Sequence, residues 1–264
     1  MERLNESRIG AVIADAFAVR ASTGTASTLH AAHGVGLMVG LDSEVTVTQP
    51  GGARASGRVM VVPPHLRHAA SCPGPTLGFL YDPEVAPRVA GYSRGRGGAF
   101  PLEGRLATRL VEALAAHRAG LAQPEVLAGL ASEAAAWLAK ESLPREPDRR
   151  VARVLEALRD PAIDRRLVVS NMGLSQAHLQ ALFVRDVGLP MRTYQLWRRL
   201  LIALAAFAHL DATTAAHSAG FADLAHFSIT CRRMLGYSPT TLRSGLLGGS
   251  VGPVLPDGEL LAEG

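Results

Sequence analysis

A short turn-plus-helix unit occurs twice in the C-terminal part of the chain, and this repetition constrains the fold more than any other feature. The first copy opens at Gly173 and ends at Gly188, and the second opens at Gly220 and ends at Gly236. Glycine is the residue best suited to the left-handed turns that border helices. Apolar residues recur between the glycines at the three- and four-residue intervals of a helix with one buried face. The repeat therefore predicts two related helix-turn-helix motifs in one helical domain.

The second helix of each motif has an apolar face and an opposite face of small or polar residues. On a 3.6-residue wheel, the inward positions are Leu179, Leu182 and Phe183 in the first motif and Phe227, Cys231 and Met234 in the second. Ser175 stands where its hydroxyl would accept a hydrogen bond from a free N–H at the start of the first of these helices. A helix in the DNA major groove needs small or polar outward residues to approach base edges. The predicted DNA-binding residues are Gln176, Ala177, Gln180, Ala181 and Arg185 in the first motif and Ala225, Ser228, Ile229, Arg232 and Arg233 in the second.

A long helix is predicted between the two motifs, from Tyr194 to Leu210, with apolar residues at positions 196, 200, 204 and 207. A rigid spacer of that length would set two recognition helices about 34 Å apart, which is one turn of DNA. A helical domain with a basic, solvated face is the plainer interpretation of either half alone. The repetition around the spacer favours the DNA-binding interpretation.

Basic residues are concentrated in the same part of the chain. Residues 148–245 contain 13 arginines and 7 acidic residues, a balance of +6, while the whole chain carries a net charge of +4. Every cationic side chain except Lys140 is an arginine, whose planar guanidinium binds phosphate and guanine in a bidentate manner. This asymmetry supports a C-terminal half that binds nucleic acid.

Residues 20–100 have the pattern of short β-strands. They are rich in Gly, Pro, Val and Thr, and turn signals separate short alternating runs such as residues 44–48. This spacing predicts a small antiparallel barrel or sandwich. Beyond Leu102 the apolar residues follow a helical period on both sides of Pro124. That pattern predicts a helical hairpin, which would pack on the strands or on a second subunit.

Four of the nine histidines lie in the strand-rich segment, at positions 30, 33, 65 and 68. Neutral imidazoles can bind a divalent metal, but the pair His30-Ala-Ala-His33 lacks the His-x-His spacing and the in-phase glutamate expected of a metal-dependent cupin. The histidines are therefore interpreted, in falling order of preference, as structural groups, as groups that line an effector pocket, or as metal ligands. The candidate effector-binding residues are His30, His33 and His68, and neither a metal site nor a cofactor is predicted.

Several classes of protein are disfavoured. Two cysteines, Cys72 and Cys231, provide neither a disulfide framework nor a metal-binding spacing. The N-terminus mixes acidic residues into a brief apolar run, unlike a signal peptide, and no segment approaches the ~20 apolar residues of a membrane span. The glycine clusters lack the context of a phosphate loop, and no catalytic constellation is found. These features predict a cytoplasmic protein that is not an enzyme.

Residues 150–243 resemble the DNA-binding domain of the AraC/XylS family of bacterial transcription regulators. The matching residues are Gly173-Leu-Ser175, His178-Leu-Gln180 with Leu182-Phe183, Arg199-Leu200 with Ala203, Gly220-Phe-x-Asp223 with His226-Phe227, and the closing Arg232-Arg233, Gly236-x-Ser-Pro239 and Arg243. The resemblance implies two helix-turn-helix units per subunit, which act behind an N-terminal sensing and dimerising domain. Residues 28–82 are similar, over a shorter stretch, to the cupin-like sensors found ahead of many such domains.

Two positions depart from the family pattern. Members commonly carry an arginine or lysine in the outward face of each recognition helix, where this chain has Ala181 and Ile229. Loss of two central cations lowers the expected affinity for DNA and flattens its salt dependence. Binding is therefore expected to depend on dimerisation, and an isolated C-terminal domain is expected to bind weakly.

The sequence thus predicts an α+β two-domain chain, with an N-terminal cupin-like β-barrel that carries a helical hairpin and a C-terminal all-α double helix-turn-helix domain. The predicted boundaries are 1–101 for the sensor, 102–140 for the hairpin that serves dimerisation, 141–148 for a linker, 149–243 for the DNA-binding domain and 244–264 for a disordered tail.

The predicted function is sequence-specific binding of promoter half-sites in double-stranded DNA by a homodimer, under the control of a small-molecule effector. RNA polymerase is a further candidate partner, and no membrane association is expected. Two alternatives remain open. One is a metal-dependent cupin enzyme with an appended helical domain, and the other is a regulator with weakened DNA contacts that acts through protein partners.

Overall fold

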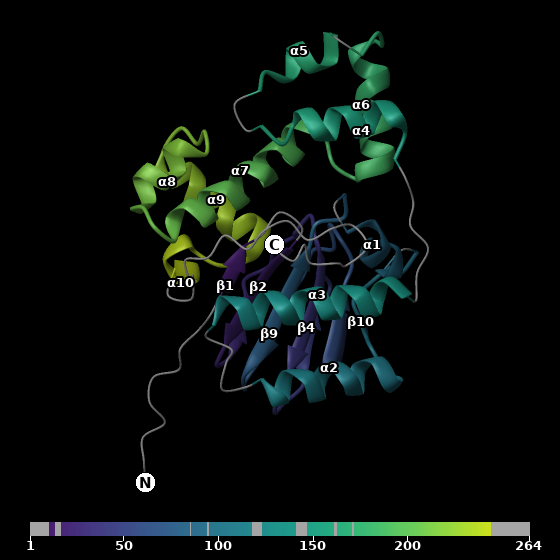
Figure 1. Ribbon diagram of the computed structural model, residues 1–264, viewed down its shortest axis with the longest axis vertical. Helices are drawn as coiled ribbons and strands as arrows, with labels where there is room; N and C mark the ends of the chain where they lie inside the picture. The colour runs from purple at the N-terminus through teal and green to yellow at the C-terminus, as the bar shows by residue number, and fades with distance from the viewer. Residues whose placement is uncertain are drawn as a thin grey trace, which may run out of the picture. The chain divides into compact units, whose positions relative to one another are not determined.

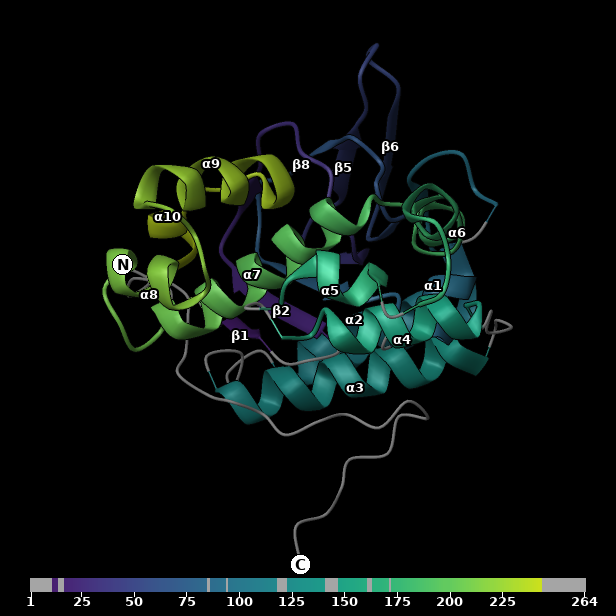
Figure 2. The same ribbon diagram turned by 90° about the horizontal axis from the view of Figure 1, so that it is seen from above.

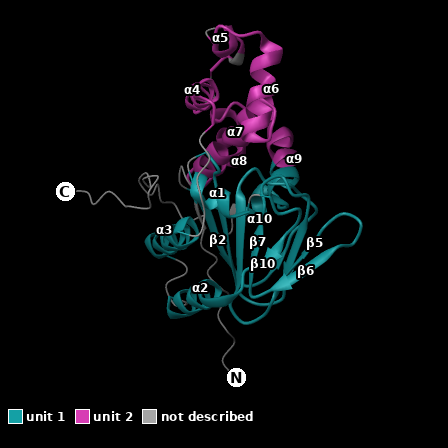
Figure 3. Cartoon of the chain, turned by 90° about the vertical axis from the view of Figure 1, so that its right-hand side faces the viewer, with its two compact units in different colours: residues 1–144, 231–264 teal, residues 145–230 magenta. Residues whose placement is uncertain are grey.

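The computed structural model describes residues 11–13, 17–84, 86–93, 95–117, 123–140, 147–160, 163–170 and 172–243. Its contacts divide the chain into two compact units: residues 1–144 together with 231–264, and residues 145–230 (Figure 3). Most of the predicted linker, at residues 141–146, and the predicted tail, at residues 244–264, lie outside the described residues.

The described strands of the first unit form two antiparallel sheets. The larger sheet has the order β1-β2-β9-β4-β7-β10 and the smaller has the order β3-β8-β5-β6. The strands are β1 (Ala11–Ile13), β2 (Phe17–Ser22), β3 (Thr25–Ala26), β4 (Val35–Gly40), β5 (Val45–Thr48), β6 (Arg54–Gly57), β7 (Val59–Val62), β8 (Ala69–Cys72), β9 (Thr76–Tyr81) and β10 (Phe100–Pro101). Figure 2 shows β5 and β6 side by side as a hairpin, as their register requires.

Alternating apolar side chains hold the centre of the larger sheet. The buried positions are Val35, Leu37 and Val39 in β4 and Leu77, Phe79 and Tyr81 in β9. β4 and β9 are antiparallel neighbours in which Leu37 lies opposite Phe79. Because side chains alternate between the two faces of a strand, all of these residues cover the same face of the sheet.

Three helices pack on this face and complete its core: α1 (Pro87–Ser93), α2 (Gly104–Ala116) and α3 (Pro124–Lys140). Figure 1 shows α2 and α3 running across the sheet. The hydroxyl of Tyr81 donates a hydrogen bond of 2.9 Å to the carbonyl of Ala131 in α3. A buried hydroxyl without such a partner would destabilise the folded state. A second, smaller core between the two sheets contains Val45, Val47, Met60, Val62, Ala70 and Cys72.

The remaining helices are α4 (Arg149–Ala157), α5 (Arg165–Ser170), α6 (Gln176–Val187), α7 (Met191–Phe207), α8 (Ala212–Ser218), α9 (Leu224–Leu235) and α10 (Pro239–Arg243). In the second unit, α4, α5, α6 and the start of α7 pack around Leu179 and Phe183. The other end of α7 packs on α9 through an edge-to-face contact of Phe207 with Phe227, at 6.2 Å between ring centroids. The division between the units falls at residue 231, within α9.

The predicted α+β organisation is confirmed, with an antiparallel sheet-rich N-terminal part followed by a helical C-terminal part. The spacer helix predicted from Tyr194 to Leu210 is wrong at both ends, because α7 runs from Met191 to Phe207. Pro190 is the residue before the helix, with φ −60° and ψ 143°, and its carbonyl accepts hydrogen bonds from the amides of residues 193 and 194. The fixed φ of proline suits the first turn of a helix, so α7 begins three residues before the predicted start.

Candidate nucleic-acid interface

The first helix-turn-helix motif consists of α5, a turn that contains Gly173, and α6. Gly173 has a φ of 63°, in the left-handed region that glycine adopts without strain. The hydroxyl of Ser175 accepts a hydrogen bond of 3.3 Å from the amide of His178, so the predicted cap of α6 is confirmed. The helix ends at Gly188, whose φ is 82°.

The second motif consists of α8, a turn at residues 219–223, and α9. Gly220 has a φ of 80°, and its carbonyl accepts a hydrogen bond of 3.0 Å from Nη1 of Arg199 in α7. The carboxylate of Asp223 accepts a bond of 2.7 Å from the amide of His226, in the manner of a helix N-cap. Phe221 packs against Phe227 with 5.3 Å between ring centroids. These contacts fix the turn to α7 and to α9.

The inward and outward faces of α6 and α9 are as predicted. All six predicted inward residues are buried: Leu179, Leu182, Phe183, Phe227, Cys231 and Met234. On the outward faces, Gln180 and Ser228 are half-buried, and the exposed residues are Gln176, Ala177, Ala181, Arg185, Ala225, Ile229, Arg232 and Arg233. The predicted DNA-binding residues are thus accessible, and their role in binding remains a prediction.

The outward faces of α6 and α9 expose apolar side chains, and one of their arginines is already paired with a carboxylate. Ile229 is 60% exposed and Val184 is 40% exposed. Arg185 lies 2.7 Å from the carboxylate of Asp186, a partner that the sequence analysis did not anticipate. Hydrogen bonding to Asp186 raises the pKa of the Arg185 guanidinium, and a phosphate would have to compete with that carboxylate for Arg185.

Residues 27–31 of the first unit contact the C-terminal end of α9. The amide and the hydroxyl of Thr28 lie 3.1 and 3.0 Å from the carbonyl of Gly236, and the amide of Ala31 donates to the carbonyl of Arg233 at 3.2 Å. These bonds satisfy carbonyls that a helix end leaves without an internal partner. Gly236 has a φ of 79°, and a Cβ at this position would lie 2.9 Å from the carbonyl oxygen of Thr28. Glycine is therefore needed here both for backbone conformation and for close approach.

Two of the candidate effector residues pair with each other. The backbones of His30 and His68 exchange two hydrogen bonds of 2.8 Å, and their ring centroids are 4.3 Å apart. Burial, together with the neighbouring His68, lowers the pKa of His30 to about 4, although a bond to the Thr28 carbonyl opposes the shift. Burial also lowers the pKa of His68.

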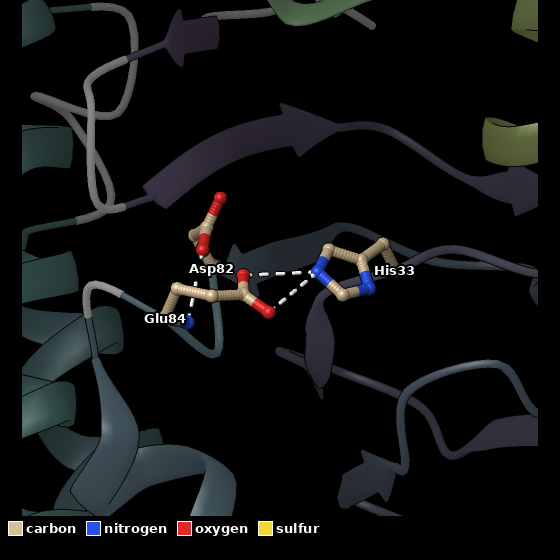
Figure 4. Close-up of side chains that lie close together, drawn as sticks. All are labelled: His33, Asp82 and Glu84. Atoms are coloured by element: carbon tan, nitrogen blue, oxygen red, sulfur yellow. Dashed lines mark hydrogen bonds and ion pairs between the residues drawn. The ribbon is translucent and has the colours of Figure 1, made fainter. Parts of the chain in front are cut away.

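The third candidate, His33, has acidic partners that the spacing of residues in the sequence does not reveal. Nε2 of His33 lies 3.0 and 2.9 Å from the two carboxylate oxygens of Glu84, and Asp82 lies beside them (Figure 4). On the other side of the ring, Nδ1 of His33 lies 2.7 Å from Nε2 of His65. Burial and the neighbouring His33 lower the pKa of His65 to about 4.

Strand pairing explains why sequence spacing did not reveal this cluster. Val35, the first residue of β4, lies opposite Tyr81, the last residue of β9. The segment that enters β4 therefore meets the segment that leaves β9, although they are about fifty positions apart in the chain. The Asp-Pro-Glu sequence at residues 82–84 would have been a usable signal only if this pairing had been known.

A family model described as a helix-turn-helix domain matches residues 168–245. A comparison with the curated proteins gives no match. Among the described residues, none of the helices combines the length and the hydropathy needed to cross a bilayer.

Solved structures of ToxT from Vibrio cholerae share the fold. ToxT from strain O395 superimposes with a TM-score of 0.54 at 10% identity, over 86% of this chain and 97% of ToxT. Wild-type ToxT from strain SCE256 with a bound unsaturated fatty acid gives 0.57 at 9% identity, over 90% and 99%. ToxT from strain O395 bound to (E)-4-(8-methylnaphthalen-1-yl)but-3-enoic acid gives 0.53 at 11% identity, over 87% and 98%. At these identities the similarity establishes the fold alone.

The family match and the two motifs together define residues 168–245 as a helix-turn-helix domain, the class of domain that binds DNA. The matched residues include most of those that carry the resemblance to the AraC/XylS family.

The lowered histidine pKa values predict a pH dependence of stability. Between pH 6.5 and about 4 the unfolded chain binds a proton at residue 30 that the folded chain does not, so the free energy of unfolding falls as the pH falls through this range. Urea unfolding at pH 7 and pH 5 measures the effect, and His30→Gln is expected to reduce it. His178→Gln, at an exposed position of α6, is the matched control. An equal pH dependence in wild type and His30→Gln would contradict the prediction.

Proposed function

We propose that this protein regulates transcription by binding two half-sites of a promoter as a homodimer, and that a small molecule controls the binding. The observation that carries the proposal is the presence of two capped recognition helices, each with a buried apolar face and an accessible outward face. The helical hairpin of α2 and α3 is the proposed dimerisation element. RNA polymerase is a proposed partner of the DNA-bound dimer.

The outward residues divide into base-reading and phosphate-binding groups. Gln180 is suited to the paired donor and acceptor on adenine, and Ile229 to the methyl group of thymine. Arg232 and Arg233 are exposed in the last turn of α9, where they would bind phosphates and fix the position of the helix on the duplex. This division assigns specificity mainly to small and apolar contacts, and affinity to a few arginines.

The contact between residues 27–31 and α9 supports a route for control. The bonds of Thr28 and Ala31 end on carbonyls of Gly236 and Arg233, at the end of the second recognition helix. An effector that binds one arrangement of this segment better than another would shift the population of subunits able to bind DNA. Control of this kind requires only that the two arrangements differ in affinity for the effector.

We propose an apolar carboxylic acid as the class of effector. ToxT structures contain an unsaturated fatty acid and a naphthalenyl butenoic acid. In this chain the guanidinium of Arg20 lies 4.7 Å from the centre of the Tyr237 ring, and its Nε is buried with no hydrogen-bond partner among the described residues. A carboxylate would provide the acceptor that this group lacks.

The enzyme alternative finds its support in the histidine and carboxylate cluster, and the partner-binding alternative in the exposed Ile229. Neither feature accounts for two separate recognition helices. DNA binding is therefore preferred.

Selection of duplex fragments with the full-length protein tests the main proposal. The expected result is enrichment of a motif with two half-sites about 34 Å apart, one helical turn. The affinity for that motif should fall steeply as salt increases, because each neutralised phosphate releases counterions. An isolated fragment of residues 149–243 should bind more weakly. A folded, dimeric protein that enriches no motif, with or without fatty acid, would refute the proposal.

Arginines introduced at the two departing positions should strengthen binding. Ala181→Arg and Ile229→Arg are each expected to raise the affinity for the selected site by about tenfold, since one arginine contact contributes about 1–3 kcal/mol. Each should also steepen the plot of log affinity against log salt by roughly 0.9. Ala152→Arg, at an exposed position of α4 outside both motifs, controls for net charge. Equal effects of all three variants would contradict the assignment of these faces to DNA.

Calorimetric titration with an unsaturated long-chain fatty acid, below its critical micelle concentration, tests the effector class. Binding should be about tenfold weaker in Arg20→Met, since the carboxylate loses a charge-assisted hydrogen bond. The alcohol with the same hydrocarbon tail is the matched control ligand. Equal affinity for acid and alcohol would refute the role of a carboxylate.

A further inference from the structure

A buried group of one imidazole and two carboxylates lies where β4 begins and β9 ends, outside both helix-turn-helix motifs. A ligand atom from each of His33, Asp82 and Glu84 lies within 4.8 Å of the others (Figure 4). His33 is 2% exposed and Asp82 is 3% exposed, and the side chain of Glu84 is 12% exposed. Buried charged groups of this kind occur in proteins as ion pairs or as metal ligands.

The three side chains lie at one end of the central strand pair of the larger sheet. β4 and β9 pair along their whole length at the centre of the larger sheet. His33 stands two residues before β4, and Asp82 directly follows β9. Oδ1 of Asp82 accepts a bond of 3.0 Å from the amide of Glu84, which fixes the turn between the two carboxylates. A site built on such elements is preorganised.

His65 orients His33 from the side away from the carboxylates. Its Nε2 lies 2.7 Å from Nδ1 of His33, and the two rings are stacked with centroids 5.0 Å apart. His65 itself has a φ of 63° and donates its amide to the carbonyl of Ala32 at 2.8 Å. With the Nδ1 proton of His33 donated to His65, loss of the proton between Nε2 and Glu84 would leave the Nε2 lone pair free to bind a metal. Ligating histidines in metal sites are commonly oriented by a partner at the second ring nitrogen.

We propose that His33, Asp82 and Glu84 bind a divalent transition-metal ion, with His65 as a positioning residue. Zinc bonds of about 2.0–2.2 Å would place neighbouring ligand atoms roughly 3.3 Å apart in a tetrahedron. The present separations, from 2.9 Å between His33 and Glu84 up to 4.8 Å, require only small side-chain movements. The metal would occupy the position of the proton that His33 and Glu84 now share, and that proton would pass to solvent.

The donor set selects the kind of metal. Magnesium and calcium prefer oxygen ligands alone, whereas an imidazole nitrogen with carboxylates suits zinc, manganese, iron, cobalt or nickel. Three protein ligands leave a fourth position for water or for a small molecule with a metal-binding group. Metal binding at this site does not require DNA binding, so each property can be refuted without the other.

The test uses tag-free, full-length protein that has been treated with a chelator and then exchanged into metal-free buffer. Titration with zinc against a chromophoric competing chelator should show one tightly bound equivalent. Asp82→Asn and Glu84→Gln should each weaken binding by at least about tenfold, and His65→Gln by about 10–100-fold without loss of stoichiometry. The matched controls are Glu44→Gln and His209→Gln, which remove similar groups at exposed positions and should leave affinity unchanged.

Cobalt absorption of the wild-type protein gives a second readout that needs no variant to fold. Bound cobalt should show the intense visible bands of a four-coordinate site, and these should disappear when zinc is added. Binding of less than one equivalent of zinc, or bands typical only of hydrated cobalt, would refute the proposal. An affinity that is unchanged in folded Asp82→Asn and Glu84→Gln, or that falls only in His209→Gln, would also refute it.

Discussion

The antiparallel pairing of β4 with β9 supports both the core and the chemistry of the N-terminal unit. Along the strands it aligns apolar residues such as Leu37 and Phe79 on one face, which α1, α2 and α3 then cover. At its end it places His33 next to residues that follow β9. A one-residue shift in register would turn the apolar side chains to the wrong face and separate His33 from Glu84. Burial of the core and formation of the cluster therefore depend on the same register.

Left-handed glycines and polar caps play the corresponding part in the helical region. Gly173, Gly188, Gly220 and Gly236 all have positive φ, and they mark corresponding borders of the two motifs. Each recognition helix is then held by a buried apolar face, so its outward face is free to vary. That freedom is used here, since Ala181 and Ile229 stand where a family member commonly carries cations. Fewer cations on these faces would reduce the electrostatic part of any affinity for DNA, while the buried faces that hold the helices are unaffected.

Gly236 belongs both to the second motif and to the contacts made by residues 27–31. It ends the second motif, and its carbonyl accepts bonds from the amide and the hydroxyl of Thr28. Segment 27–33 thus carries the bonds to α9 at one end and His33 at the other. Along the backbone, His33 stands only two residues after Ala31, whose amide donates to a carbonyl of α9.

Features that depend on local chemistry could be predicted from the sequence. Periodicity and glycine spacing gave both motifs, the buried faces of α6 and α9 and the Ser175 cap, because a helix fixes which residues share a face within a few positions. The predicted ends of α7 are each wrong by three residues, and Pro190 accounts for the earlier start. Three contacts could be seen only in the folded chain: Arg185 with Asp186, residues 27–31 with α9, and His33 with Glu84. The last two contacts join segments far apart in the chain, and strand pairing and packing, which no local pattern encodes, bring them together.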